Sequence, residues 1–432
     1  METKKIIFLK IISLYLILFI LLICSNNLLS IKIPSQATLR VELNIALQGN
    51  ADNVILNLYA YPPNFTLLSD SEFIEWTKVN DSIQVQFNHV ESKNLKLIST
   101  LNQKLKIYKL SKAAWPSLDQ TLSVYLNKNE KIDINQEIQQ LALALIDEDP
   151  LKTAYQIAEW IRKNVKYDLQ LANQVMPASW VLKNKRGVCS EYSILFIALC
   201  RSINLPARYV SGLAYSDGKF EEHAWAEVAI KNGSNLVWIP FDITFKQYGW
   251  LDPYHVKLRV GEPDTSSLAI NYQGLLSSSF SVKAFLLKET YQPLELASLQ
   301  LKPYLDEVAS GSYLPLIVEA RNLQPYYLFL PVFLTRAPST VQDNEKILML
   351  EPYSSKETSF LLYLPFMPEC SFGCVSNLQV ESYFAPNATK SIKIAPMFTS
   401  LSRDQAELLS KVETTDLKKH LCSINQLSLI HI

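Results

Sequence analysis

Cys189 and His223 are the residues of this chain whose types and spacing most clearly suggest covalent chemistry. Cys189 stands in the stretch RGVCSE, at the start of an apolar run that predicts a helix, and His223 begins the strand-like run HAWAEVAI. A thiol becomes a nucleophile when a base holds it as thiolate and a third group orients that base, and the positive end of a helix dipole helps. The two residues therefore predict acyl transfer on a cysteine, although a lone cysteine is more often a buried structural thiol.

An Asn-Gly pair suggests where the third group lies. Asn232 and Gly233 stand between two strand-like runs, and this pair is typical of a two-residue type I′ hairpin turn. If these two residues are the centre of the turn, His223 stands directly opposite Asp242, with Cβ atoms about 5 Å apart. Asp242 could then accept the imidazole N–H and fix its tautomer, as the third member of a catalytic triad does. Taken singly, His223 could be a core histidine and Asp242 an ordinary acid at a strand end.

The elements that must hold these residues are predicted by a change in hydrophobic period. Residues 150–165 carry apolar side chains at helical spacing, with Asp149 as a candidate N-cap and Pro150 at the first helical position. The run after Cys189 is apolar on nearly every side, which indicates a buried central helix. Strand-like runs follow, so residues 131–275 are predicted to be an α+β domain in which this helix packs on an antiparallel sheet.

Two β-rich regions flank this domain in the prediction. Short alternating runs over residues 36–130 indicate an antiparallel β-domain. After a serine-rich break at LLSSSFS, strand signals over residues 290–398 are spaced like an immunoglobulin-type sandwich. Residues 400–432 are predicted to form a helical tail. The expected architecture is therefore an α+β core with N- and C-terminal β-sandwich-like domains.

The N-terminus predicts a membrane segment. Lys4, Lys5 and Lys10 precede or open an apolar run that ends at Ile23. Lysines on the N-terminal side of a membrane segment place that side in the cytoplasm. Residues 1–30 are therefore expected to be a signal-anchor with a transmembrane helix, which would leave the bulk of the chain extracytoplasmic at the cell membrane. A cleaved signal peptide and a secreted chain are the alternative, but no small-x-small cleavage site follows.

Cysteine usage and charge restrict the partners. Cys370 and Cys374 in CSFGC are expected to form a disulfide rather than a metal site, since no histidine stands nearby and an extracytoplasmic compartment permits oxidation. The chain has 41 basic and 41 acidic residues, so no basic excess points to nucleic acid. No carboxylate-rich loop suggests calcium. We therefore expect no cofactor, no metal and no nucleic-acid partner.

The segment that contains these residues closely resembles the transglutaminase-like superfamily, a papain-related group of cysteine enzymes. The resemblance covers about residues 150–256 and rests on RGVCSE opening a helix, LPAR leading into VSG, HAW on one strand and WIPFD on the next. It places the nucleophile on Cys189, the imidazole on His223 and the carboxylate on Asp242. It also implies an oxyanion site made by the Cys189 backbone N–H and a second donor, for which Trp180 is a candidate.

The resemblance further implies a reaction through a thioester on Cys189. The expected function is an extracytoplasmic peptidase or amidase acting on protein or peptide amide bonds, or on cell-surface polymer, with protein-glutamine acyl transfer and cross-linking as the less favoured reaction. A non-catalytic envelope scaffold or binding protein with a vestigial triad is the alternative. His255, the other histidine of this segment, has no partner that can be identified from sequence.

Overall fold

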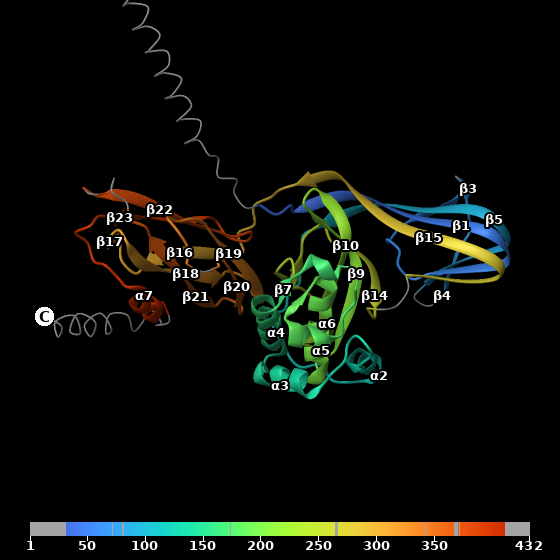
Figure 1. Ribbon diagram of the computed structural model, residues 1–432, viewed down its shortest axis with the longest axis horizontal. Coiled ribbons are helices and arrows are strands. Elements are labelled where there is room, and N and C mark those ends of the chain that lie inside the picture. Colours follow the sequence, from blue (N-terminus) through green and yellow to red (C-terminus); the bar gives the residue numbers. More distant parts are fainter. Residues whose placement is uncertain are drawn as a thin grey trace, which may run out of the picture. The chain divides into compact units, whose positions relative to one another are not determined.

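The computed structural model describes residues 32–410 except positions 71, 80, 81, 173, 264–266, 342, 367–369 and 371. From Ile33 onward these residues form one compact unit. Its architecture is α+β and rich in strands, as predicted (Figure 1).

A five-stranded antiparallel sheet and a group of helices form the core (Figure 1). Helix α6 (Cys189–Ser202) lies against this sheet, and every residue from Glu191 to Arg201 is buried. The predicted central helix is therefore confirmed. In spatial order the strands are β12 (Gln247–Tyr248), β11 (Asn235–Asp242), β10 (Lys219–Asn232), β9 (Ala207–Ser216) and β14 (Val256–Gly261).

The other helices of the core begin where their sequences provide caps. The Asp149 carboxylate accepts the Leu151 N–H at 2.7 Å, and Pro150 is the first residue of α4, as predicted. A capping carboxylate satisfies backbone donors that have no partner inside the helix. The helices are α2 (Gln120–Ser123), the 3₁₀ helix η1 (Val124–Leu126), α3 (Gln136–Ala144), α4 (Pro150–Asn164), the 3₁₀ helix η2 (Leu169–Leu171) and α5 (Ala178–Asn184).

The N-terminal β-region is one long sheet, and one of its strands comes from the part of the sequence that follows the α+β core. Strand β15 (Leu268–Thr290) pairs with β1 (Gln36–Leu58), and β1 pairs with β5 (Ser82–Lys104). The stretch LLSSSFS therefore lies inside β15, so the expected break there is wrong, and the strands of the N-terminal β-region form one sheet. Serines are tolerated because β15 is largely exposed and pairs through its backbone. The short strands are β2 (Thr66–Ser69), β3 (Glu72–Phe73) and β4 (Thr77–Val79).

The C-terminal region contains two sheets whose buried side chains share one core. The first is formed by β16 (Ala297–Pro303), β18 (Ser312–Asn322) and β21 (Ser355–Leu364). The second is formed by β17 (Glu307–Val308), β23 (Ala388–Ile394), β22 (Cys374–Glu381), β19 (Leu328–Arg336) and β20 (Glu345–Leu350). Cys370 and Cys374 form a disulfide at the start of β22. Helix α7 (Arg403–Leu409) follows, and the rest of the expected tail lies outside the described residues.

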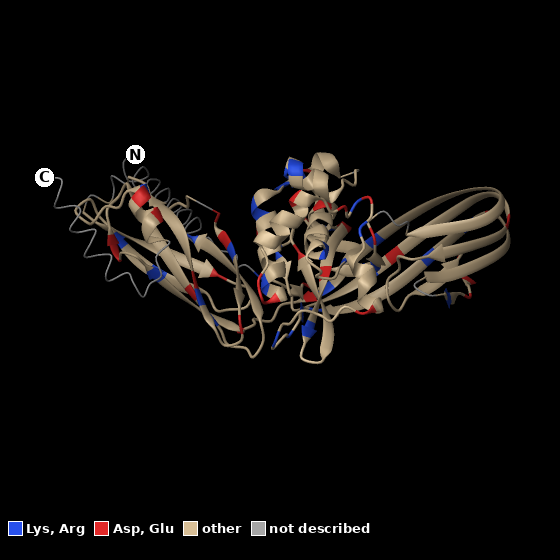
Figure 2. Ribbon diagram, turned by 90° about the horizontal axis from the view of Figure 1, so that it is seen from below, with Lys and Arg blue, Asp and Glu red and all other residues tan. Residues whose placement is uncertain are grey.

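Polar contacts join the C-terminal sheets to helix α4. The Tyr155 hydroxyl donates to the Ile347 carbonyl at 2.7 Å, and Arg162 lies 3.1 Å from the carboxylate of Asp343. A two-stranded ribbon of β6 (Lys106–Ile107) and β13 (Trp250–Leu251) adds to the core. Acidic and basic residues are interspersed along the ribbon of the core (Figure 2).

The structure contradicts the expected membrane anchor. Within the part of the chain that the structure describes, no helix is both long enough and apolar enough to cross a membrane. The prediction of a signal-anchor, a transmembrane helix and single-pass localisation at the cell membrane is corrected accordingly. The segment on which it rested, residues 1–30, lies outside the described residues.

Candidate active site

The local sequence before α6 places Cys189 at the first position of that helix. The Glu191 carboxylate, fully buried, accepts the N–H of Val188 at 2.9 Å and the N–H of Met176 at 3.1 Å. Gly187 allows this arrangement, because a Cβ there would lie 2.3 Å from the Glu191 Cβ. Cys189 is the first residue of α6, so it lies at the positive end of the helix dipole, and its side chain is only partly buried.

Replacing Gly187 by alanine is expected to destabilise the protein by about 1–3 kcal/mol, because overpacking a filled site forces neighbours apart. Thermal unfolding would measure the change as a lower Tm. Gly218→Ala is the control, since a Cβ at Gly218 meets no atom within 4 Å and carries only the strain of a φ of +86°. An unchanged Tm for Gly187→Ala would contradict the packing argument.

The hairpin that holds His223 and Asp242 has a different register from the predicted one. Asn232 pairs with Asn235, so the central residues of the turn are Gly233 and Ser234. Gly233 has a φ of +63° and Ser234 has no positive φ, which fits a type II′ turn with glycine first. The predicted facing pair is therefore wrong by two residues. A shift of two keeps a side chain on the same face of the sheet, so His223 and Asp242 become diagonal neighbours.

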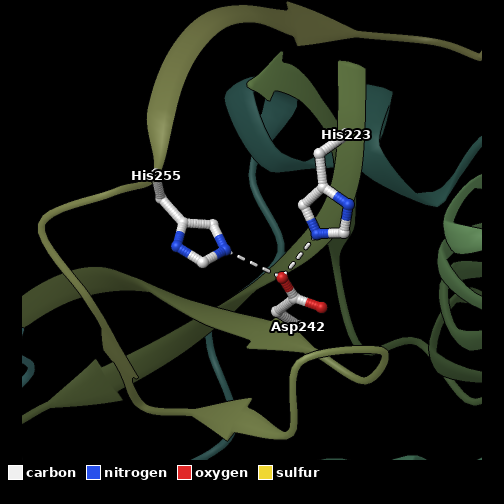
Figure 3. A group of neighbouring side chains, drawn as sticks. All are labelled: His223, Asp242 and His255. Atoms are coloured by element: carbon white, nitrogen blue, oxygen red, sulfur yellow. Dashed lines mark hydrogen bonds and ion pairs between the residues drawn. The ribbon is translucent and has the colours of Figure 1, made fainter. Parts of the chain in front are cut away.

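The structure brings His223 and Asp242 into direct contact. His223 Nε2 lies 2.6 Å from Asp242 Oδ2, and their side chains are only 7% and 1% exposed. Figure 3 shows the imidazole of His223 directed at this oxygen. The other carboxylate oxygen, Oδ1, accepts the Thr244 hydroxyl at 2.8 Å and the Phe245 N–H at 3.0 Å. These bonds fix both the position and the rotation of the carboxylate.

The charges of this group stabilise a protonated His223. Burial alone would lower the pKa of His223, but the Asp242 charge and hydrogen bonds with Asp242 and the Cys189 side chain raise it to about 10. Burial would raise the pKa of Asp242, but the imidazoles of His223 and His255 hold it far below its usual range. Since Nε2 of His223 faces Asp242, the remaining ring nitrogen, Nδ1, is the one available to Cys189. The three predicted residues therefore lie in the order thiol, imidazole, carboxylate.

His255 is a member of this group that the sequence did not identify. Its Nε2 lies 2.9 Å from Asp242 Oδ2, the same oxygen that His223 contacts (Figure 3). Its Nδ1 lies 2.8 Å from Asp252 Oδ1. The loop after β13 makes this contact, and it brings His255 across from the end of β11. The only local signal is the spacing of three residues between Asp252 and His255.

Two adjoining hollows meet at Cys189 and His223. Their volumes are about 370 and 450 Å³, and both are lined by Tyr167, Cys189, Glu221, Glu222 and His223. Tyr167 reaches them because β7 (Lys166–Tyr167) pairs in parallel with β8 (Arg186–Gly187), directly before Cys189.

Trp180, predicted as an oxyanion donor, lines neither of these hollows. It lies on α5, and the Arg186 guanidinium stands 5.6 Å from the centre of its ring.

The donor atoms of His223, Asp242 and His255 lie within 4.8 Å of one another, which is close enough to reach one metal ion. The residue types would suit zinc, which takes histidine nitrogen and carboxylate oxygen at about 2.0–2.2 Å. However, both nitrogens already contact Asp242 Oδ2 at 2.6 and 2.9 Å. These short N···O distances are those of charge-assisted hydrogen bonds, which account for the cluster.

Comparisons with known proteins found one matching family model, within the α+β core, and solved structures that align over a larger part of the chain. The model of the transglutaminase-like superfamily matches residues 139–243. A candidate cysteine protease of known structure from Cytophaga hutchinsonii is 22% identical, with 60% of this chain and 93% of that chain aligned, at a TM-score of 0.45. Red sea bream transglutaminase is 8% identical, with 85% of this chain and 96% of that chain aligned, at a TM-score of 0.24. No curated protein matches the chain.

Proposed function

We propose that the transglutaminase-like domain formed by residues 139–243 is a cysteine-dependent enzyme that cleaves or transfers the acyl group of protein amide bonds, with hydrolysis as its main reaction. The observation that carries this proposal is the order of Cys189, His223 and Asp242 beside two hollows, with His223 held 2.6 Å from Asp242. A nucleophile, a base and an orienting acid in contact are the parts that covalent acyl transfer needs.

In the proposed reaction the Cys189 thiolate attacks the amide carbonyl carbon and forms a tetrahedral intermediate. His223, protonated because Asp242 stabilises its charge, gives a proton to the amide nitrogen as the C–N bond breaks. The amine leaves and a thioester remains on Cys189. A water molecule, deprotonated by His223, then attacks the thioester carbonyl, the C–S bond breaks and the acid product leaves, which restores the Cys189 thiolate and protonated His223. An amine in place of water would complete an acyl transfer.

The negative oxygen of the tetrahedral intermediate needs donors close to Cys189. The backbone N–H of Cys189 is one candidate, because the first N–H groups of a helix have no partner inside it. The second proposed donor is the hydroxyl of Tyr167, a residue that lines both hollows. Burial and the nearby charges of Cys189 and Asp242 raise the pKa of Tyr167 to about 12. The hydroxyl therefore keeps its proton at neutral pH and can donate.

Tyr167→Phe is expected to lower kcat by about 10–100-fold with little change in KM, because one oxyanion donor is lost and the ring remains. Steady-state kinetics at neutral pH would measure both constants. Trp180→Phe is the matched control, since Trp180 lines neither hollow. If Trp180→Phe showed the larger loss of kcat, the donor would be Trp180 rather than Tyr167.

The two hollows suit an extended polypeptide. One is bordered by charged side chains, among them Arg162 and Lys246, and the other by apolar side chains of the long sheet, among them Phe280 and Val282. A chain segment crossing Cys189 would place residues of different character on the two sides of the reacting carbonyl. We therefore propose protein or peptide substrates.

The substrate and the reaction can be tested together by mass spectrometry. A protein extract is incubated with wild type or Cys189→Ala, each with and without an added primary amine such as cadaverine. New cleavage ends that require Cys189 would support hydrolysis, and incorporation of cadaverine would support acyl transfer instead. No Cys189-dependent change in any arm would contradict the proposed function.

We also propose an oxidising compartment for this enzyme, on the basis of the disulfide between Cys370 and Cys374. Protein taken from its native cells and alkylated before digestion should yield this linked pair. Finding both thiols alkylated would contradict the proposal.

A further inference from the structure

An unbroken series of polar contacts runs from Cys189 through His223 and Asp242 to a second buried pair. His255 Nε2 lies 2.9 Å from Asp242 Oδ2, and His255 Nδ1 lies 2.8 Å from Asp252 Oδ1. Gln247 holds Asp252 in turn, since its amide Nε2 donates to Asp252 Oδ2 at 2.6 Å. The His255 side chain is only 2% exposed.

Both ring nitrogens of His255 face carboxylate oxygens, and a carboxylate oxygen can only accept. Each nitrogen must therefore carry a proton, which makes His255 an imidazolium between Asp242 and Asp252. A buried charge is costly unless it is paired, and here one cation stands between two anions. His255 thus compensates part of the Asp242 charge that His223 experiences.

The geometry points to Asp252 and His255 as positioning residues for the reaction: they hold Asp242, by a second imidazole on the same oxygen, in the orientation and charge state that His223 needs. This inference rests on the proposed function. It extends the group from three residues to five, in the order Cys189, His223, Asp242, His255 and Asp252.

Aromatic rings and a few charged groups surround the imidazole of His255, and its hydrogen-bond partners are the carboxylates of Asp242 and Asp252. The rings of Trp225, Phe245 and His223 have their centres 5.5, 5.6 and 5.7 Å from the imidazole of His255. Behind it lies a third hollow of about 590 Å³, on whose walls stand Asp252, His255 and the three lysines Lys104, Lys106 and Lys257. The groups that bear charge around His255 are therefore Asp242, Asp252, His223 and these lysines.

A series of variants at His255 separates the hydrogen bond from the charge. His255→Phe keeps an aromatic ring and removes both donors, and we expect kcat to fall about 10–100-fold with KM changed less than about 2-fold, because a misplaced base loses the attack geometry. His255→Gln can still donate an amide N–H to Asp242 and should recover most of kcat. In both variants the loss of a cation beside Asp242 should move the alkaline limb of the rate–pH profile to higher pH.

The limb is followed by kcat/KM across pH, and the rate of iodoacetamide alkylation reports separately whether Cys189 is held as a reactive thiolate. His89→Phe is the matched control, because His89 also contacts an aspartate, Asp52, at 2.7 Å but lies exposed on the long sheet. If His255→Phe fails to fold, Asp252→Asn provides the second variant, with a smaller loss of kcat expected. A folded variant with wild-type kcat and an unmoved limb would overturn the inference. A wild-type Cys189 that alkylates no faster than Cys200 would instead overturn the proposed function.

Discussion

Cys189→Ala is expected to lower kcat by at least about 10⁴-fold, to the level of the uncatalysed background, while the fold stays intact. The physical reason is that alanine cannot form the thioester, and among the described residues Cys189 is the only cysteine that lines either hollow. The assay follows cleavage of a peptide identified from the extract experiment. Circular dichroism and Tm would show that the variant remains folded.

Cys200→Ala is the matched control for this prediction. Cys200 lies on the same helix, but it is completely buried, and burial raises its thiol pKa beyond the range in which it could react. We expect this variant to keep wild-type kcat and to be less stable, because it leaves a small cavity. A Cys189→Ala variant with substantial activity, at any Tm, would contradict the thioester mechanism.

Asp242→Asn is expected to lower kcat by about 10³–10⁴-fold, because the amide N–H can donate to His223 Nε2 and favour the wrong imidazole tautomer, and because a neutral amide no longer stabilises the positive charge of His223. In wild type the pKa of His223 is raised to about 10, chiefly by Asp242 against the opposing effect of burial. The proton-donating form is therefore present at neutral pH and is lost as pH rises through about 10. Without the carboxylate the pKa of His223 falls, so the alkaline limb should move to lower pH.

The pH dependence of kcat/KM measures this shift, because acyl transfer needs the proton on His223. Asp52→Asn is the control, since Asp52 contacts His89 on the exposed sheet and should leave the limb in place. The direction is the decisive result, because Asp242→Asn and His255→Phe should move the same limb in opposite senses. A limb that stays near pH 10 in Asp242→Asn would show that Asp242 does not set the pKa of His223.

The candidate site could be predicted from sequence where local rules act. The apolar run after Cys189 indicates a buried helix, and α6 is buried almost throughout. The Asn-Gly pair correctly indicates a hairpin, but the turn centres on Gly233 and Ser234, one residue later than predicted. The error in register is harmless to the site because side chains alternate with a period of two along a strand. His223 and Asp242 therefore remain on one face.

The sequence by itself determined the residue types of the proposed triad, the helix that starts at Cys189 and the strands that carry His223 and Asp242, because caps, turns and periodicity act over a few residues. Only the tertiary structure decided which distant groups complete the site. His255 and Asp252 join Asp242 through a loop, and Tyr167 reaches Cys189 through a short parallel pairing. It also decided that β15 pairs with β1 across more than 200 residues of sequence. Such contacts arise from the packing of the folded chain, and no local pattern records them.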